Sequence, residues 1–154
     1  MYDTSKDLLD AFRAAPEVLM MLLHDVTQEQ AQAARGGDEN WSVVEVVCHL
    51  RDAEERGIER MQAMRDYDDP LLPGYDQEQW ARERNYAAAN LGDALEAFLR
   101  LRNIHLADLI ALSPEEWQRT GRHEEQGQIT ISAHTLHLVS HDSIHAAQIA
   151  RQLG

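Results

Sequence analysis

Hydrophobic residues recur at three- and four-residue intervals along most of the chain, a spacing typical of amphipathic α-helices. In the first such segment, Leu8, Phe12 and Leu19 fall near one stripe. No strand–helix–strand alternation is visible, so the expected fold is all-α. The pattern predicts four long helices over 4–26, 40–64, 90–113 and 130–154, and two shorter helical pieces over 27–34 and 77–89.

Two stretches interrupt the helical period. Residues 66–76 contain two prolines and a glycine, which predicts a long loop. Residues 118–130 are polar with two glycines, and there we expect a loop or a small hairpin. Because the first loop is long, the chain has room to cross over between the second and third helices. The sequence therefore predicts a four-helix bundle with a long crossover loop, forming one domain over 1–154.

The start of the second long helix carries conflicting signals. Four valines between positions 43 and 47 would suit a strand. A longer helical period follows them, and Glu45 comes three residues after Ser42, which is the spacing of a capping box. We therefore expect a helix to begin here.

The net charge of the chain limits the classes of partner that it can bind. Lys and Arg number 14 against 27 Asp and Glu, a formal net charge of −13. Such a surface repels phosphate groups, which argues against binding to nucleic acid or to an anionic membrane. Cys48 is the only cysteine, which excludes an intramolecular disulfide and a cysteine-based zinc finger. The acidic N-terminal stretch predicts no signal peptide, and no apolar run is long enough to span a bilayer, so we expect a cytoplasmic protein.

Five of the eight histidines lie where they could share a site. His141 and His145 are four residues apart on one helix face, but so are His137 and His141, and spacing alone does not choose between these pairs. His49 lies on another expected helix, next to its apolar face, and therefore leans into the bundle. His134 is expected to face solvent or to be a hydrogen-bond partner.

Buried histidines need partners, because an unpaired polar group in the interior costs about 1–3 kcal/mol. One explanation is that these are core histidines hydrogen-bonded to each other or to the backbone. The other is a metal ion shared between two facing helices, as helix bundles often build their metal sites. The paired spacing also occurs in the H-E-x-x-H motif, but the glutamate of that motif is absent here. Spacing leaves both explanations open.

Two stretches carry a resemblance to a known family. "NWSVVEVVCHLRDAEE" and "GQITISAHTLHLVSHDSIHAAQI" resemble, in order and separation, the two signatures of the DinB/YfiT-like superfamily. The resemblance implies a four-helix bundle with three metal-binding histidines, which match His49, His141 and His145. It also implies a divalent ion, zinc or nickel, and often a homodimer. Ser140 and the "HAAQ" segment depart from the commoner family pattern. These departures affect the residues expected to shape the pocket and leave the three ligands unchanged.

The resemblance also implies an activity. Characterised members include S-transferases that use low-molecular-weight thiols such as bacillithiol or mycothiol. An ion held by three neutral imidazoles could activate either a thiol or a water molecule. We therefore expect a thiol-dependent S-transferase acting on a small electrophile. The alternatives are a metal-dependent hydrolase and a non-catalytic, metal-stabilised binding or stress protein. A fourth protein ligand, for which His137 is the candidate, would favour a structural metal.

Several neighbours could orient the ligands or line a pocket. Gln148 lies three residues after His145 on the same face, and His137 is expected to form part of the pocket wall. Glu45 and Asp52 flank His49 along its helix, although a helix cap explains Glu45 more simply. For Asp52, and likewise for the acid that follows His141, the simpler explanation is a solvated surface charge.

Overall fold

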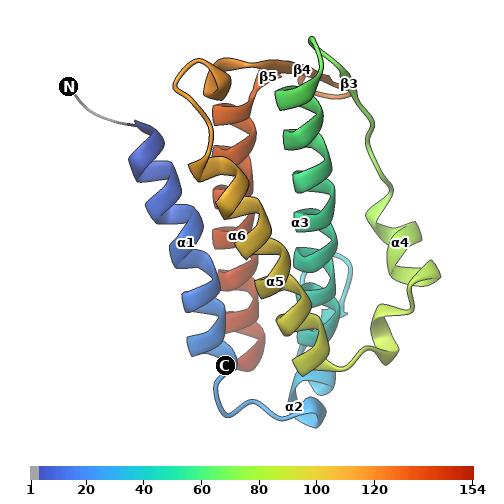
Figure 1. Ribbon diagram of the computed structural model, residues 1–154. Coiled ribbons are helices and arrows are strands. Elements are labelled where there is room, and N and C mark those ends of the chain that lie inside the picture. The colour runs from blue at the N-terminus through green and yellow to red at the C-terminus, as the bar shows by residue number, and fades with distance from the viewer. Residues whose placement is uncertain (1–3) are drawn as a thin grey trace.

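The computed structural model describes residues 4–154 and shows four long helices packed side by side (Figure 1). The four-helix bundle expected from the sequence is therefore confirmed. The long helices are α1 (Thr4–Leu23), α3 (Val43–Asp66), α5 (Leu91–Ile110) and α6 (Ile131–Leu153). The shorter elements are α2 (Gln28–Ala33), α4 (Gln77–Glu83) and the 3₁₀ turns η1 (Tyr86–Ala88) and η2 (Glu116–Gln118).

The order of the helices around the bundle differs from a simple up-and-down arrangement. Helix α1 packs against α5 and α6, and α3 packs against the same two helices, so that α1 and α3 occupy opposite corners. The segment between α3 and α5 carries α4 and η1 back along the outside of the bundle (Figure 1). Helices α3 and α5 consequently run in the same direction, as the predicted long crossover requires.

Helix α3 begins with a complete capping box. The Ser42 hydroxyl accepts from the Glu45 backbone N–H, and the Glu45 carboxylate accepts from the Ser42 backbone N–H. These reciprocal bonds satisfy two donors that a helix start otherwise leaves free. The valines that follow are buried in the core, so tertiary packing stabilises a helix over their preference for strands.

Two small sheets lie at the bundle ends. Strands β4 (Thr120–His123) and β5 (Gly127–Thr130) form an antiparallel hairpin, the second of the two forms expected for this stretch. Strand β3 (Leu71–Leu72) pairs in parallel with β4, a contact that its proline-flanked sequence did not indicate. Strands β1 (Arg35–Gly36) and β2 (Trp41–Ser42) pair just before α3. The three-stranded sheet lies where α3 ends and α6 begins (Figure 1).

A buried arginine joins all four long helices. Arg102 of α5 donates to Glu54 of α3 at 2.9 Å and to Asp142 of α6 at 2.7 Å. It also donates to the backbone oxygen of Phe12 in α1 at 2.7 Å. That oxygen is free because the residue four positions later is Pro16, which has no N–H to donate to it. The Phe12 carbonyl that Pro16 leaves free thus accepts a hydrogen bond from the buried arginine.

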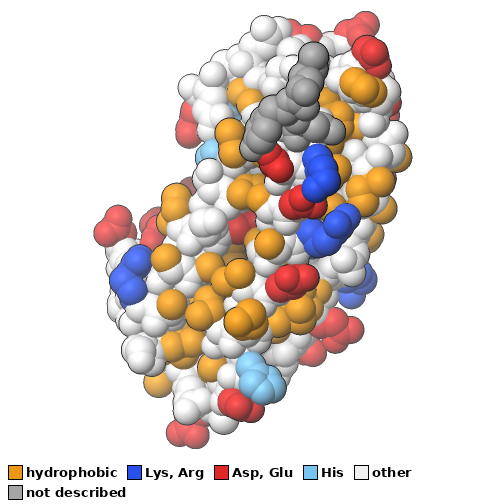
Figure 2. Space-filling view, turned by 90° about the vertical axis from the view of Figure 1, so that its left-hand side faces the viewer, with side chains coloured by type: hydrophobic (Ala, Val, Ile, Leu, Met, Phe, Trp, Pro, Cys, Tyr) orange, Lys and Arg blue, Asp and Glu red, His pale blue; other side chains and the backbone are white. Residues whose placement is uncertain are grey.

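Part of the apolar surface stays exposed. Figure 2 shows hydrophobic side chains gathered over the lower part of the α1 face, where Val18, Met20 and Met21 are exposed. On α6, Leu136 and Ile144 are also exposed. The homodimer expected from the sequence remains a prediction, and this surface is available for it. Within residues 4–154, none of the helices has the length and apolar character needed to cross a membrane.

Candidate metal centre

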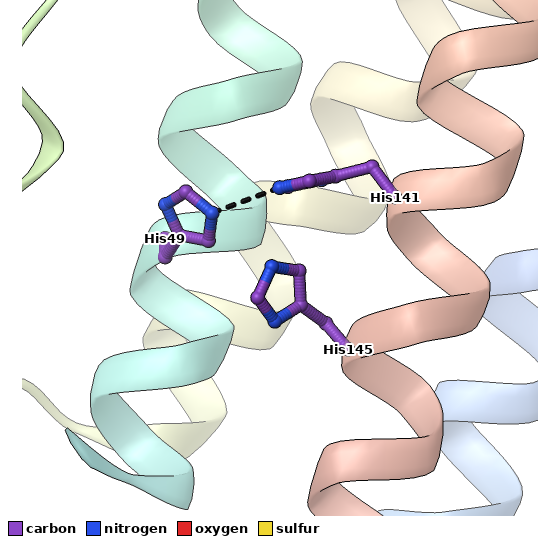
Figure 3. Close-up of side chains that lie close together, drawn as sticks. All are labelled: His49, His141 and His145. Carbon is purple, nitrogen blue, oxygen red and sulfur yellow. Dashed lines mark hydrogen bonds between the residues drawn. The ribbon is translucent and has the colours of Figure 1, made fainter. Parts of the chain in front are cut away.

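Three imidazoles meet between α3 and α6. His49 projects from α3, and His141 and His145 project toward it from α6 (Figure 3). One ring nitrogen of each lies within 4.8 Å of the other two, and Nε2 of His49 lies 2.9 Å from Nε2 of His141. The helix spacing explains this convergence, because residues four apart on α6 present adjacent rings to the same point on α3.

The geometry distinguishes the two histidine pairs. The ring of His145 lies 4.8 Å from that of His49, measured between centroids. The ring of His137 stacks against that of His141, with 6.5 Å between the two ring centroids, and the His137 side chain is exposed. His137 therefore lies outside the cluster of three. It lines the neighbouring cleft.

The three imidazoles are held in the neutral form. Burial, followed by the nearby His145, lowers the pKa of His49 to about 4. Burial, followed by the other two rings of the cluster, also lowers the pKa of His141, and burial lowers that of His145. A neutral imidazole has a free lone pair, which is the form that binds a metal ion.

A chain of amides fixes the tautomer of His145. The Gln152 amide nitrogen donates to the backbone oxygens of Ala34 and Trp41, at 2.9 and 3.1 Å. The Gln152 oxygen must then accept, and Gln148 donates to it at 2.8 Å. The Gln148 oxygen is consequently turned to Nδ1 of His145, also at 2.8 Å. An amide oxygen only accepts, so Nδ1 carries the proton and Nε2 keeps its lone pair.

The nitrogen donors fit a divalent ion of the zinc or nickel type. Three neutral imidazoles form a ligand set that such ions prefer over magnesium or calcium. His49 and His141 make their 2.9 Å hydrogen bond only if one of the two nitrogens carries a proton, since two lone pairs repel. Nδ1 of His49 is buried and has no partner among the described residues. A cation bound between the facing ring nitrogens would remove the repulsion between their lone pairs.

Two acids near the site have other tasks. Glu45 belongs to the capping box and to an ion pair with Arg35 at 3.1 Å, which matches the simpler explanation for it. Asp52 is fully buried, and the expectation of a solvated charge was wrong. Its carboxylate accepts from the hydroxyl of Tyr86 and from Arg84. Burial is a tertiary property, and Asp52 gave no sign of it in the sequence.

The acid after His141 was also misjudged. Asp142 is buried and faces away from the cluster, where it accepts from Arg102 in the bundle core. Cys48, by contrast, behaves as expected for a small apolar residue. It is fully buried, and burial raises the pKa of its thiol to about 11. Neither side chain is therefore available as a catalytic base or nucleophile.

A cleft of about 760 Å³ opens beside the histidine cluster. Its wall includes His49 and His141, and it extends along α3 and α6 toward the three-stranded sheet. Sequence reasoning missed Arg60 as a lining residue, because an arginine in a helix rich in charges gives no local signal. It also misplaced His134, which neither faces solvent nor has a hydrogen-bond partner among residues 4–154.

Acidification should lower the stability of the folded protein, because His134 is buried. Burial, followed by the nearby His105 and Arg60, lowers its pKa from 6.5 to about 3. Below pH 6.5 the unfolded chain takes up a proton that the folded chain refuses, so stability falls as the pH drops toward 3. His134→Gln should remove about 1.4 kcal/mol per pH unit from this slope in urea titrations between pH 6 and 4.

The exposed His24 provides the control for this experiment, because His24→Gln removes a histidine without changing a buried site. Equal flattening of the slope in both variants would contradict the assignment to His134.

Comparisons with known proteins agree with this architecture. A family model described as the DinB superfamily matches residues 11–149. A protein of Oceanobacillus iheyensis named "putative metal-dependent hydrolase" is 27% identical over 135 residues, which are 87% of this chain and 77% of that protein. The solved structure of YfiT from Bacillus subtilis, described as a probable metal-dependent hydrolase with an unusual four-helix bundle topology, superposes with a TM-score of 0.88. The superposition covers 96% of this chain and 85% of that one, at 21% sequence identity.

Proposed function

Because this chain belongs to the DinB superfamily, we propose that it is a metal-dependent enzyme whose His49, His141 and His145 bind one divalent ion. The observation that carries the proposal is the convergence of three neutral ring nitrogens within 4.8 Å, beside an accessible cleft. Zinc and nickel are the metals that such a ligand set suits best.

Each part of the site has a definable task. When bound, the ion would supply Lewis acidity that lowers the pKa of a water or thiol nucleophile. The amide chain through Gln148 holds His145 with Nε2 free to bind. The cleft gives a small substrate access to His49 and His141. Nearby, Ala53 and Leu138 form an apolar part of the cleft wall.

We place hydrolysis first among the reactions. The Oceanobacillus relative bears the name of a metal-dependent hydrolase, and the likeness to it extends over most of both chains. A hydrolase needs a group that accepts a proton from the attacking water. His137 is the candidate, because it is exposed, lines the cleft and stacks against His141.

Thiol transfer, the reaction expected from the sequence, is the second candidate. One observation favours it: the acid next to the cluster, Asp142, is engaged by Arg102 and cannot serve as a base. A thiol is far more acidic than water and has less need of a base. The thiol would come from a small cosubstrate, because the chain's single cysteine is buried.

Turnover measurements on metal-loaded protein separate the two reactions. Hydrolysis predicts release of p-nitrophenol from p-nitrophenyl esters without added thiol, and His137→Gln should lower kcat. Thiol transfer predicts conjugation of 1-chloro-2,4-dinitrobenzene that requires an added thiol. Loss of either activity in His141→Ala ties it to the cluster. No turnover above the His141→Ala background in either assay would contradict an enzymatic function for these substrate classes.

Removing Gln152 should weaken metal binding from a distance. Without it, Gln148 is free to turn, and the tautomer of His145 is no longer fixed. Substitution of residues that orient a metal ligand typically costs about 10- to 100-fold in affinity. We expect about a tenfold higher Kd for Zn²⁺ in Gln152→Ala, measured by competition with a chromogenic chelator. The exposed Gln32→Ala is the matched control, and an equal Kd in both variants would contradict this role.

A further inference from the structure

One face of α3 forms a track along the cleft from the histidine cluster to an arginine. His49, Ala53, Gly57 and Arg60 all line the cleft, and their spacing places them on one side of the helix. The two ends of this track are about 16 Å apart along the helix axis. Between them, Ala53 and Gly57 are small and the Leu138 side chain covers Gly57, so a ligand along the track would lie against Ala53 and Leu138.

The guanidinium of Arg60 is incompletely satisfied. It donates one hydrogen bond, from Nη2 to the backbone oxygen of Pro73 at 2.8 Å. Its Nε is buried without a partner, and within residues 4–154 it forms no ion pair. Burial, followed by the neighbouring Arg56, lowers its pKa by more than the nearby Tyr75, Glu124 and Glu59 raise it. The other arginines of α3 are all paired with carboxylates, as the contacts of Arg51, Arg56 and Arg65 show.

His134 supplies a second unpartnered group in the same cleft. Its side chain comes from α6, is 3% exposed, and has no hydrogen-bond partner at either ring nitrogen among the described residues. It lines the cleft together with Arg60. A neutral imidazole must still donate one hydrogen bond and accept another to avoid a penalty of about 1–3 kcal/mol. A buried donor beside an unpaired cation is the chemistry that recognises an anionic oxygen.

We propose that Arg60 and His134 form an anion subsite that binds the carboxylate of a small ligand, whose other end reaches the histidine cluster. The guanidinium provides charge-assisted hydrogen bonds to the carboxylate, and the imidazole N–H adds a further donor. The inference deepens the proposed function, on which it rests for the reacting end of the ligand. The carboxylate itself could belong to the substrate or to a thiol cosubstrate.

Acidic residues at the rim of the cleft limit the charge that a ligand can carry. Asp76, Glu124 and Glu125 also line the cleft, and all three are exposed. The Asp76 carboxylate is engaged by the backbone of α4 as its N-cap. Exposed acids are well screened by water, whereas the half-buried Arg60 is not. A ligand with one carboxylate and an extended neutral chain therefore fits the cleft better than a multiply charged one.

The probe for this subsite is hexanoate, compared with the uncharged hexanamide. Binding is followed by NMR on the full-length protein, both metal-loaded and after chelation, because a carboxylate could also bind an ion directly. We expect hexanoate to shift the signals of Gly57, Arg60 and His134 in both forms, and hexanamide to bind at least about tenfold more weakly. Arg60→Gln should weaken hexanoate binding about tenfold or more, and Arg60→Lys less. The exposed Arg100→Gln on α5 should leave it unchanged.

Several results would overturn the proposal. These are equal binding of hexanoate and hexanamide, wild-type affinity in Arg60→Gln, or shifts confined to residues outside the cleft. The shifts in the wild-type protein decide the matter even if Arg60→Gln does not fold. Persistence of binding after chelation separates this subsite from the proposed metal centre, so that either can fail alone. A further probe is 6-mercaptohexanoate, which carries both a thiol and a carboxylate. If it binds more tightly than hexanoate, and chelation abolishes the difference, the carboxylate belongs to the thiol cosubstrate. Equal affinity assigns it to the substrate.

Discussion

Replacing Arg102 with methionine should lower the free energy of unfolding by about 3–5 kcal/mol. Methionine fills a similar volume but leaves the carboxylates of Glu54 and Asp142 buried without their cation. It also leaves the backbone oxygen of Phe12 without a donor, since Pro16 cannot supply one. Removing one partner from a buried ionic cluster lowers the free energy of unfolding far more than removing an exposed ion pair does.

Denaturant unfolding by circular dichroism measures this effect. Arg100→Met, on the exposed side of the same helix, should change stability by less than about 0.5 kcal/mol. The deficit of Arg102→Met should also shrink as the pH falls. Unpaired buried carboxyls have raised pKa values, so the folded variant takes up protons and is stabilised in acid relative to the wild type. A deficit below about 1 kcal/mol would contradict the role assigned to Arg102.

Replacing His141 with alanine should nearly abolish binding of Zn²⁺. The ring of His141 lies close to both other members of the cluster, 4.8 Å from that of His49 and 4.4 Å from that of His145. Two remaining imidazoles on separate helices cannot complete a catalytic-type zinc site, which uses three protein ligands. We expect Kd to rise more than about 100-fold.

Thermal unfolding gives an independent readout of the same variant. An ion present at 100 times its Kd stabilises the folded state by about 2.7 kcal/mol. The wild-type protein should gain this stabilisation when Zn²⁺ is added, and His141→Ala should not. His137→Ala is the matched control, since it removes a histidine one turn away from His141 and outside the cluster. Loss of the zinc effect in His137→Ala would contradict the ligand assignment.

Much of the fold could be predicted from local sequence. The 3.6-residue period identified the long helices, and the Ser42 capping box fixed the start of α3 against the strand preference of its valines. Strand β3 was missed, because two residues between prolines carry no period and pair only through contact with the distant β4. The diagonal placement of α1 and α3 likewise depends on packing between helices, which no local pattern encodes.

The candidate site was predictable to a similar extent. Equal spacing made His137 and His145 equivalent in the sequence, and the family resemblance singled out His145. The structure brings His145 to His49 and leaves His137 in the cleft wall. Asp52 and Asp142 were misjudged because a charged residue on a helix is usually solvated, and burial depends on partners from other helices. Arg60 is a functional candidate for the converse reason, since it is partly buried and has no such partner.

Metal analysis of the purified protein tests the central claim most directly. Wild-type protein loaded with Zn²⁺ or Ni²⁺ and freed of excess ion should retain one ion per chain by inductively coupled plasma mass spectrometry. His49→Ala, His141→Ala and His145→Ala should each retain almost none, whereas His137→Ala should match the wild type. A wild-type protein that retains no ion, or cluster variants that retain as much as the wild type, would contradict the proposed metal centre.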